Sequence, residues 1–267
     1  GTNYEYMYKQ EPKHGDLYMS QFGLINLLSS RMSSKDFTYC ASALMRMSGV
    51  YDYSSYPRMP SFMYMSGTPL NEAVIAAMEI VPEFQKRNRL QIVNTVFLTD
   101  GEGNTLNKVY TMEGNRLYPY SKTFTHMVIR DPKTRHEEVY ERNSGWGYSA
   151  QSKQTDCLIR LLKARTNSHV IGFFVGEIKD IYNRVDYFWP TEVGTNSKTR
   201  QSFIEKIKDK FRKESSLVVT STGYDDYYIL RSNGLDTDDD EELTFRDNAT
   251  TRGMVSAFSK YTGNKIA

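Results

Sequence analysis

The side chains best suited to chemistry in this sequence are a threonine and an aspartate in two separate loops. Thr68 stands in the tight turn Ser66–Leu70, at a point where a helix is expected to begin. Asp100 directly follows the short apolar run Val96–Thr99 and precedes a glycine. In open α/β sheets, ligands bind at the carboxyl ends of the strands. A hydroxyl and a carboxylate delivered to that edge are hard oxygen donors, which suit Mg²⁺ or Mn²⁺.

Together these segments resemble the second and third ligand loops of a von Willebrand factor A domain. The resemblance implies that Thr68 and Asp100 are the threonine and the aspartate of a metal-ion-dependent adhesion site. The run Gly67–Ala73 is most similar to the intracellular branch that includes the T subunit of aerobic cobaltochelatase and related bacteriophage proteins. The resemblance is best over residues 20–105 and fainter around Ile171–Val175 and Tyr224–Leu230.

The first ligand loop of that family, Asp-x-Ser-x-Ser after the first strand, has no match in this chain. Asp52–Tyr56 contains an acid and serines, but Tyr56 replaces the second serine, and we interpret the segment as a turn. The chain begins at Gly1 and stops at Ala267 in what reads as an unfinished helix. We therefore expect residues 1–267 to be a single partial domain that lacks its first strand and first loop. The alternative is a degenerate site that binds no metal.

The hydrophobic periodicity predicts alternating helices and short strands. Apolar residues at helical spacing predict helices at 20–32, 153–165 and 199–213. Ser33 or Ser34 is expected to cap a further helix that ends before Gly49. Thr68 is expected to be the N-cap of the next helix, with Pro69 in its first turn. Strands are expected at Leu90–Leu98, Val170–Val175, Ser216–Thr220 and Tyr227–Leu230.

This order of elements predicts an α/β fold. We expect a doubly wound, Rossmann-like sheet of the von Willebrand A type, with helices on both faces and Val93–Leu98 as a central strand. Residues 104–150 are expected to form a β-rich hairpin insertion on the ligand edge, with strands at Val109–Met112, His126–Arg130 and Glu138–Tyr140. Within it, Trp146 and Tyr148 are flanked by glycines, which is typical of a recognition loop or of a plug over the edge of a core.

The composition excludes several classes of function. A formal charge of +2 gives no general attraction to nucleic acid. Cys40 and Cys157 are too few and too far apart for a disulfide framework, so a reduced, cytoplasmic setting is expected. No apolar run is long enough to span a membrane.

Other possible sites have simpler interpretations. The four histidines, His14, His126, His136 and His169, lack the spacing of a zinc motif and are expected to be ordinary surface or strand residues. The acidic run Asp236–Glu242 lacks the glycine and the final glutamate of a calcium loop. Gly101–Asn104 has no lysine in P-loop register, so ATP binding is assigned to a partner.

The resemblance implies a metal-ion-dependent protein-interaction module. Its partner would be a AAA+ ATPase of the MoxR or cobaltochelatase S-subunit kind, and a carboxylate from the partner would complete the metal shell. A cytoplasmic location is expected, in the host cell if the chain is phage-encoded. The alternative function is a metal-assisted hydrolase that uses Asp100, Glu102 and a histidine.

Overall fold

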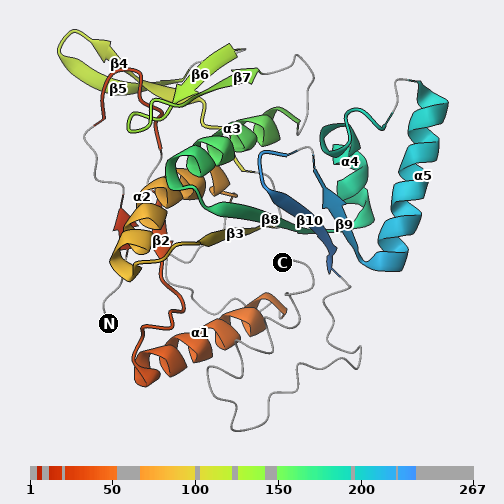
Figure 1. The fold of residues 1–267 in the computed structure, drawn as a ribbon, viewed down its shortest axis with the longest axis horizontal. Helices are drawn as coiled ribbons and strands as arrows, with labels where there is room; N and C mark the ends of the chain where they lie inside the picture. The colour runs from red at the N-terminus through yellow and green to blue at the C-terminus, as the bar shows by residue number, and fades with distance from the viewer. Residues whose placement is uncertain are drawn as a thin grey trace.

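The protein is a mixed α/β structure built on a four-stranded sheet (Figure 1). The computed structural model describes residues 5–7, 12–19, 22–52, 67–99, 103–121, 126–141, 149–193, 196–220 and 222–232. The strand order in the sheet is β3 (Asn94–Thr99), β8 (His169–Gly176), β10 (Asp226–Arg231) and β9 (Ser216–Val219). The first three strands run parallel to one another, whereas β9 is antiparallel to β10. All four strands were predicted from the sequence.

Strand β3 lies at one edge of this sheet, and the prediction that it is central was wrong for the described residues. It pairs with β8 from Asn94 opposite His169 to Thr99 opposite Phe174, and no described residue pairs with its other side. Its side chains Val96 and Leu98 are 53% and 70% exposed. Periodicity can identify a strand, but its place in a sheet depends on pairing with residues far away in the chain.

Four helices pack beside the sheet. They are α2 (Leu70–Asn88), α3 (Ser149–Thr166), α4 (Ile178–Phe188) and α5 (Ser197–Glu214). Helices α2, α3 and α5 were predicted, whereas α4 was not. None of the described helices combines the length and the apolar composition needed to cross a membrane.

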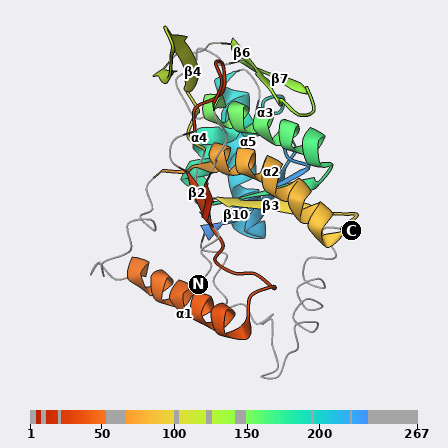
Figure 2. The ribbon, with the colours of Figure 1, turned by 90° about the vertical axis from the view of Figure 1, so that its left-hand side faces the viewer.

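These four helices cover one face of the sheet. Their core side chains pack with Val170, Phe174 and Ile229, which point to the same side of β8 and β10. Of the described helices, only α1 (Ser34–Asp52) lies on the opposite side, apart from the sheet (Figures 1 and 2). The predicted cover of helices on both faces is therefore not seen in the described part of the chain. Apolar side chains of α1, such as Tyr39 and Met45, remain exposed.

The N-terminal segment differs from its prediction. Residues 20–32 were expected to be helical, but β2 (Gly23–Ile25) is a short strand that pairs antiparallel with β1 (Glu5–Met7). Helix α1 was predicted, and the Ser33 hydroxyl accepts a hydrogen bond from the Asp36 N–H at its start. It continues through Gly49, where a loop was expected, to Asp52.

The segment after β3 forms two β-hairpins. In the first, β4 (Lys108–Glu113) pairs with β5 (Arg116–Ser121), a strand that the sequence did not predict. In the second, β6 (His126–Arg130) pairs with β7 (Glu137–Glu141), as predicted. Trp146, Tyr148 and the acidic run 236–242 lie outside the described residues.

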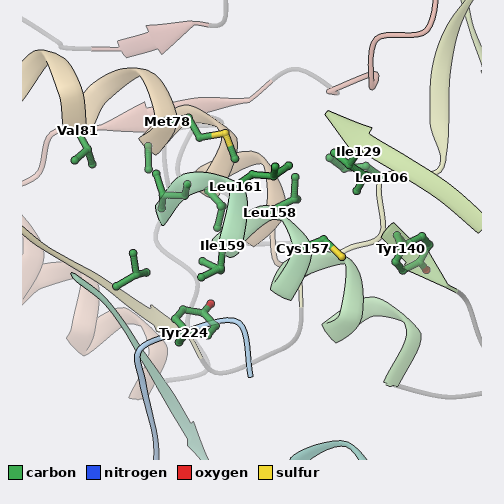
Figure 3. Close-up of a cluster of buried hydrophobic side chains, with 14 residues drawn as sticks. Met78, Val81, Leu106, Ile129, Tyr140, Cys157, Leu158, Ile159, Leu161 and Tyr224 are labelled. Atoms are coloured by element: carbon green, nitrogen blue, oxygen red, sulfur yellow. The ribbon is translucent and has the colours of Figure 1, made fainter. Parts of the chain in front are cut away.

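The second hairpin closes the main core over helix α3. Ile129 and Tyr140 of this hairpin join a cluster that also contains Met78 of α2 and Leu158 of α3 (Figure 3). Tyr224, which precedes β10, enters the same cluster from the sheet side (Figure 3). The hairpin is thus part of the core of the domain, not an isolated appendage.

A buried carboxylate on α3 holds the turn before β10. Asp156 accepts a hydrogen bond from the Gly223 N–H at 2.8 Å and another from the Tyr187 hydroxyl at 2.8 Å. Burial raises the pKa of Asp156 to about 6, although these two hydrogen bonds act in the opposite direction. A Cβ at Gly223 would lie 2.5 Å from the main-chain oxygen of Asp156, so the turn fits against α3 only with glycine there.

The pKa of Asp156 predicts a pH dependence of stability with a definite sign. The ordinary pKa of 3.8 applies to the unfolded chain, whereas the folded value is about 6. Between these values the folded protein holds a proton that the unfolded chain has released, so stability rises as the pH falls. At about pH 7 the burial of this charge costs on the order of 2–3 kcal/mol. We expect the melting temperature to rise by several degrees between about pH 7 and pH 5.

Asp156→Asn should remove most of that rise, because an amide has no charge to bury. Its oxygen still accepts from Gly223, and its NH₂ group can donate to the Tyr187 oxygen. Thermal unfolding monitored by circular dichroism at a series of pH values checks this, with Asp209→Asn on the exposed face of α5 as the control. Parallel curves for wild type and Asp156→Asn would contradict the assignment.

Candidate functional site

Thr68 lies in the turn before α2, but it is not the N-cap residue of the helix. The N-cap position is Pro69 (φ −79°, ψ 47°), and no side chain makes a cap hydrogen bond. The prediction that Thr68 is the N-cap was therefore wrong by one residue. Pro69 accounts for the shift, because its ring fixes a backbone angle suited to entering the helix and it has no N–H to be capped. Thr68 is half-buried, and its hydroxyl makes no capping hydrogen bond to the helix.

The segment that returns from β3 docks on this turn. The Asn104 N–H donates to the Thr68 carbonyl oxygen at 3.0 Å. A Cβ at Gly103 would lie 3.1 Å from Leu70 Cβ, and a Cβ at Gly67 would lie 2.9 Å from Asn104 Nδ2. Gly67 also has a φ of +77°, which favours glycine. The two glycines thus let the loops that precede α2 and follow β3 lie against each other.

A buried polar cluster fixes the same junction to α3. The Gln154 side chain accepts from the Leu106 N–H at 2.7 Å and donates to the Leu106 carbonyl at 3.1 Å. It also accepts from Asn71 Nδ2, which in turn donates to the Asn104 carbonyl at 2.8 Å. Thr155 completes the cluster by donating to Asn71 Oδ1 at 2.7 Å. Asn71 and Gln154 are fully buried, so this cluster positions the start of α2 rigidly.

Asp100 and Glu102 lie outside the described residues. The structure therefore brings Thr68 next to Gly103 and Asn104, but it gives no position for the predicted carboxylate. Over the described ranges, no group of three or more His, Cys, Asp or Glu side chains has the geometry of a metal site.

Glu72, in the first turn of α2, is a polar residue that the sequence analysis did not select for the site. It is 5% exposed, and its Oε2 atom has no hydrogen-bond partner among the described residues. Burial raises the pKa of Glu72, and a hydrogen bond from its own N–H lowers it only in part. The position of Glu72, three residues after the N-cap, can be recognised in the sequence. The burial of its side chain cannot.

The four histidines lie on different elements of the structure. His14 accepts from the Met112 N–H on β4, and His136 pairs with Glu138 at 3.3 Å on the second hairpin. His169 lies 2.8 Å from Asp226 at the start of β8, which is the opposite end of the strand from the loop that follows β3. His126 begins β6.

The donors near the junction are a hydroxyl, a buried carboxylate and main-chain carbonyls. All are oxygen ligands, so the chemistry of this set fits Mg²⁺ or Mn²⁺ and not a thiolate-preferring metal. Comparisons of the chain with models of protein families, with curated proteins and with solved structures found no match.

Proposed function

We propose that this chain is a metal-ion-dependent protein-interaction module. In this proposal Thr68 and Asp100 contribute oxygen ligands to one Mg²⁺ or Mn²⁺ ion, and a carboxylate of a partner protein completes the shell. The partner proposed is a AAA+ ATPase of the MoxR or cobaltochelatase S-subunit kind, as the resemblance to the von Willebrand A family implies. The ion would act as a bridge between the two proteins.

The observation that carries the proposal is the hydrogen bond from the Asn104 N–H to the Thr68 carbonyl. It fastens the loop after β3 to the turn before α2. Asp100 follows Thr99, the last residue of β3, directly in the sequence. In a parallel sheet these loops emerge at the carboxyl edge, where ligands of α/β proteins bind.

A von Willebrand A fold is part of the same proposal. The parallel strands β3, β8 and β10, joined through helices, support it. No described strand lies on the side of β3 away from β8, and this edge offers a place for one further strand. Two features count against the doubly wound arrangement. Helices α2 to α5 lie on one face of the sheet, and several apolar side chains of α1 are exposed. The described residues bring no histidines together in a way that favours the hydrolase, so it is not proposed.

Metal binding is the first test. Titration of the protein with Mn²⁺, followed by the electron paramagnetic resonance signal of the free ion, should show one weak site, with a Kd on the order of millimolar because few ligands come from this chain. Thr68→Val and Asp100→Asn should each abolish saturable binding. Glu113→Gln, an exposed residue at the end of β4, is the control and should bind like wild type.

Partner capture is the second test. The immobilised protein is mixed with an extract of cells of the source organism, with either Mg²⁺ or EDTA. A AAA+ ATPase should be retained only with Mg²⁺, and Thr68→Val should lose it. Absence of any saturable Mn²⁺ binding, or unchanged binding by Asp100→Asn, would refute the metal site.

A further inference from the structure

The feature that leads beyond the proposed site is the carboxylate of Glu72. Helix α2 starts at Leu70, so Glu72 is its third residue. A glutamate at this position commonly accepts a hydrogen bond from the N–H of the N-cap residue. That residue is Pro69 here, and proline has no N–H.

The missing N–H leaves Glu72 with a different partner. Its carboxylate accepts a hydrogen bond from the N–H of Glu72 itself. Amide N–H groups in the first turn project from the N-terminal end of a helix, and helical side chains lean in the same direction. The carboxylate therefore lies at the end of α2 that Thr68 precedes.

A comparison with the next acidic residue of α2 shows what Glu72 lacks. Glu79 is more exposed than Glu72, yet its two oxygens lie 2.6 Å from Arg165 Nη2 and 2.7 Å from Lys133 Nζ. Glu72 is 5% exposed, and no described cation pairs with it. Buried carboxylates are ordinarily paired with a cation or bound to a metal. Glu72 is thus the more deeply buried of the two glutamates, yet it is the one with no described cation beside it.

We infer that Glu72 is a direct ligand of the divalent cation, through its Oε2 atom, beside the Thr68 hydroxyl. This inference rests on the proposed function and adds a carboxylate that the family resemblance does not supply. The preferred ions are Mg²⁺ and Mn²⁺, because both donors are hard oxygens. The bound ion would provide the partner that Oε2 lacks among the described residues.

Glu72→Gln tests the inference, with Mn²⁺ as the probe and free-ion electron paramagnetic resonance as the readout. The matched control is Glu83→Gln, an exposed glutamate farther along the same helix. We expect Glu72→Gln to weaken Mn²⁺ binding at least about ten-fold and Glu83→Gln to leave it unchanged. The melting temperature of the metal-free protein should not fall in Glu72→Gln, because the amide keeps the shape and removes an unpaired buried charge.

Salt separates ligation from a long-range charge effect. A purely electrostatic effect of Glu72→Gln on Mn²⁺ affinity should shrink strongly between low salt and about 0.3 M KCl, because salt shortens the range of charge–charge interactions. An effect caused by the loss of a ligand should persist.

The outcomes for the two proposals differ. If Thr68→Val abolishes binding and Glu72→Gln does not weaken it, the ligand role is overturned and the proposed function stands. If wild type binds no Mn²⁺, both are overturned. A fall in stability of metal-free Glu72→Gln with unchanged Mn²⁺ affinity would make Glu72 a structural residue.

Discussion

Replacement of Gln154 with alanine is expected to lower the free energy of unfolding by roughly 3–5 kcal/mol, because each buried main-chain group left unpaired costs about 1–3 kcal/mol. The Gln154 side chain is the hydrogen-bond partner of both the N–H and the carbonyl of Leu106. Alanine satisfies neither group and also releases the amide of Asn71. Because Gln154 is fully buried, bulk water does not reach these groups in the folded protein.

Urea denaturation followed by circular dichroism measures this loss. Gln201→Ala on the exposed face of α5 is the control and should change stability by less than about 0.5 kcal/mol. Amide hydrogen exchange should accelerate at Leu106 in Gln154→Ala even under conditions that keep the protein folded. Because Gln154 fixes the segment that follows Asp100, the variant is also expected to bind Mn²⁺ more weakly. A loss below about 1 kcal/mol would mean that the cluster rearranges and does not hold the junction.

The sequence predicted the elements of the sheet better than their arrangement. Strands β3, β8, β9 and β10 and helices α2, α3 and α5 follow local periodicity, and the structure contains all of them. The prediction of a helix at 20–32 was wrong, because the spacing of the apolar residues there is compatible with either a helix or a strand. The short strand β2 forms only by pairing with β1, which is a contact that no local pattern encodes.

Helix α4 was missed although the chain carries a signal for it. Ile181, Val185 and Phe188 recur at helical spacing and are buried. Glu177 and Asp180 form a reciprocal capping box at its start. A search for caps before a short periodic segment would have found this helix.

The candidate site could be predicted only in part, for physical reasons. Thr68 was recognisable because the turn, the proline and the helix start are local features. The hydrogen bond from the Asn104 N–H to its carbonyl joins the two loops, whereas the approach of the Thr68 and Asp100 side chains stays a prediction. The burial of Glu72 and Asp156 could not be predicted, since burial depends on what the folded chain places above a side chain. Another glutamate farther along α2, Glu83, is exposed although its residue type is the same as that of Glu72.

The second large effect is expected at the turn of the β6–β7 hairpin. Asp131 is buried and accepts hydrogen bonds from the Lys133 N–H at 3.0 Å and from the Thr134 hydroxyl at 2.8 Å. Arg165 of α3 lies 3.2 Å away, and it also binds Glu79 of α2. One carboxylate therefore both shapes the turn and connects it to two helices.

Asp131→Ala is expected to destabilise the protein by about 3–5 kcal/mol, because it leaves the Lys133 N–H and the Thr134 hydroxyl without their acceptor and removes one of the two carboxylates that pair with Arg165. Asp131→Asn should lose less, since its oxygen still accepts one of the turn hydrogen bonds. Asp209→Ala, an exposed residue of α5, is the control. Urea denaturation gives the three values, and hydrogen exchange in β6 and β7 shows whether the hairpin separates first.

The pH dependence distinguishes Asp131 from Asp156. Burial alone would raise the pKa of Asp131, but the hydrogen bonds from Lys133 and Thr134 and the charge of Arg165 hold it below the ordinary value of 3.8. Its stabilising effect is therefore complete above that pH and is lost as the pH falls through the lower, folded value. The penalty of Asp131→Ala should accordingly stay constant from neutral pH down to about pH 4 and shrink only below it. A penalty that already disappears near pH 6 would show that the carboxylate is not held by these partners.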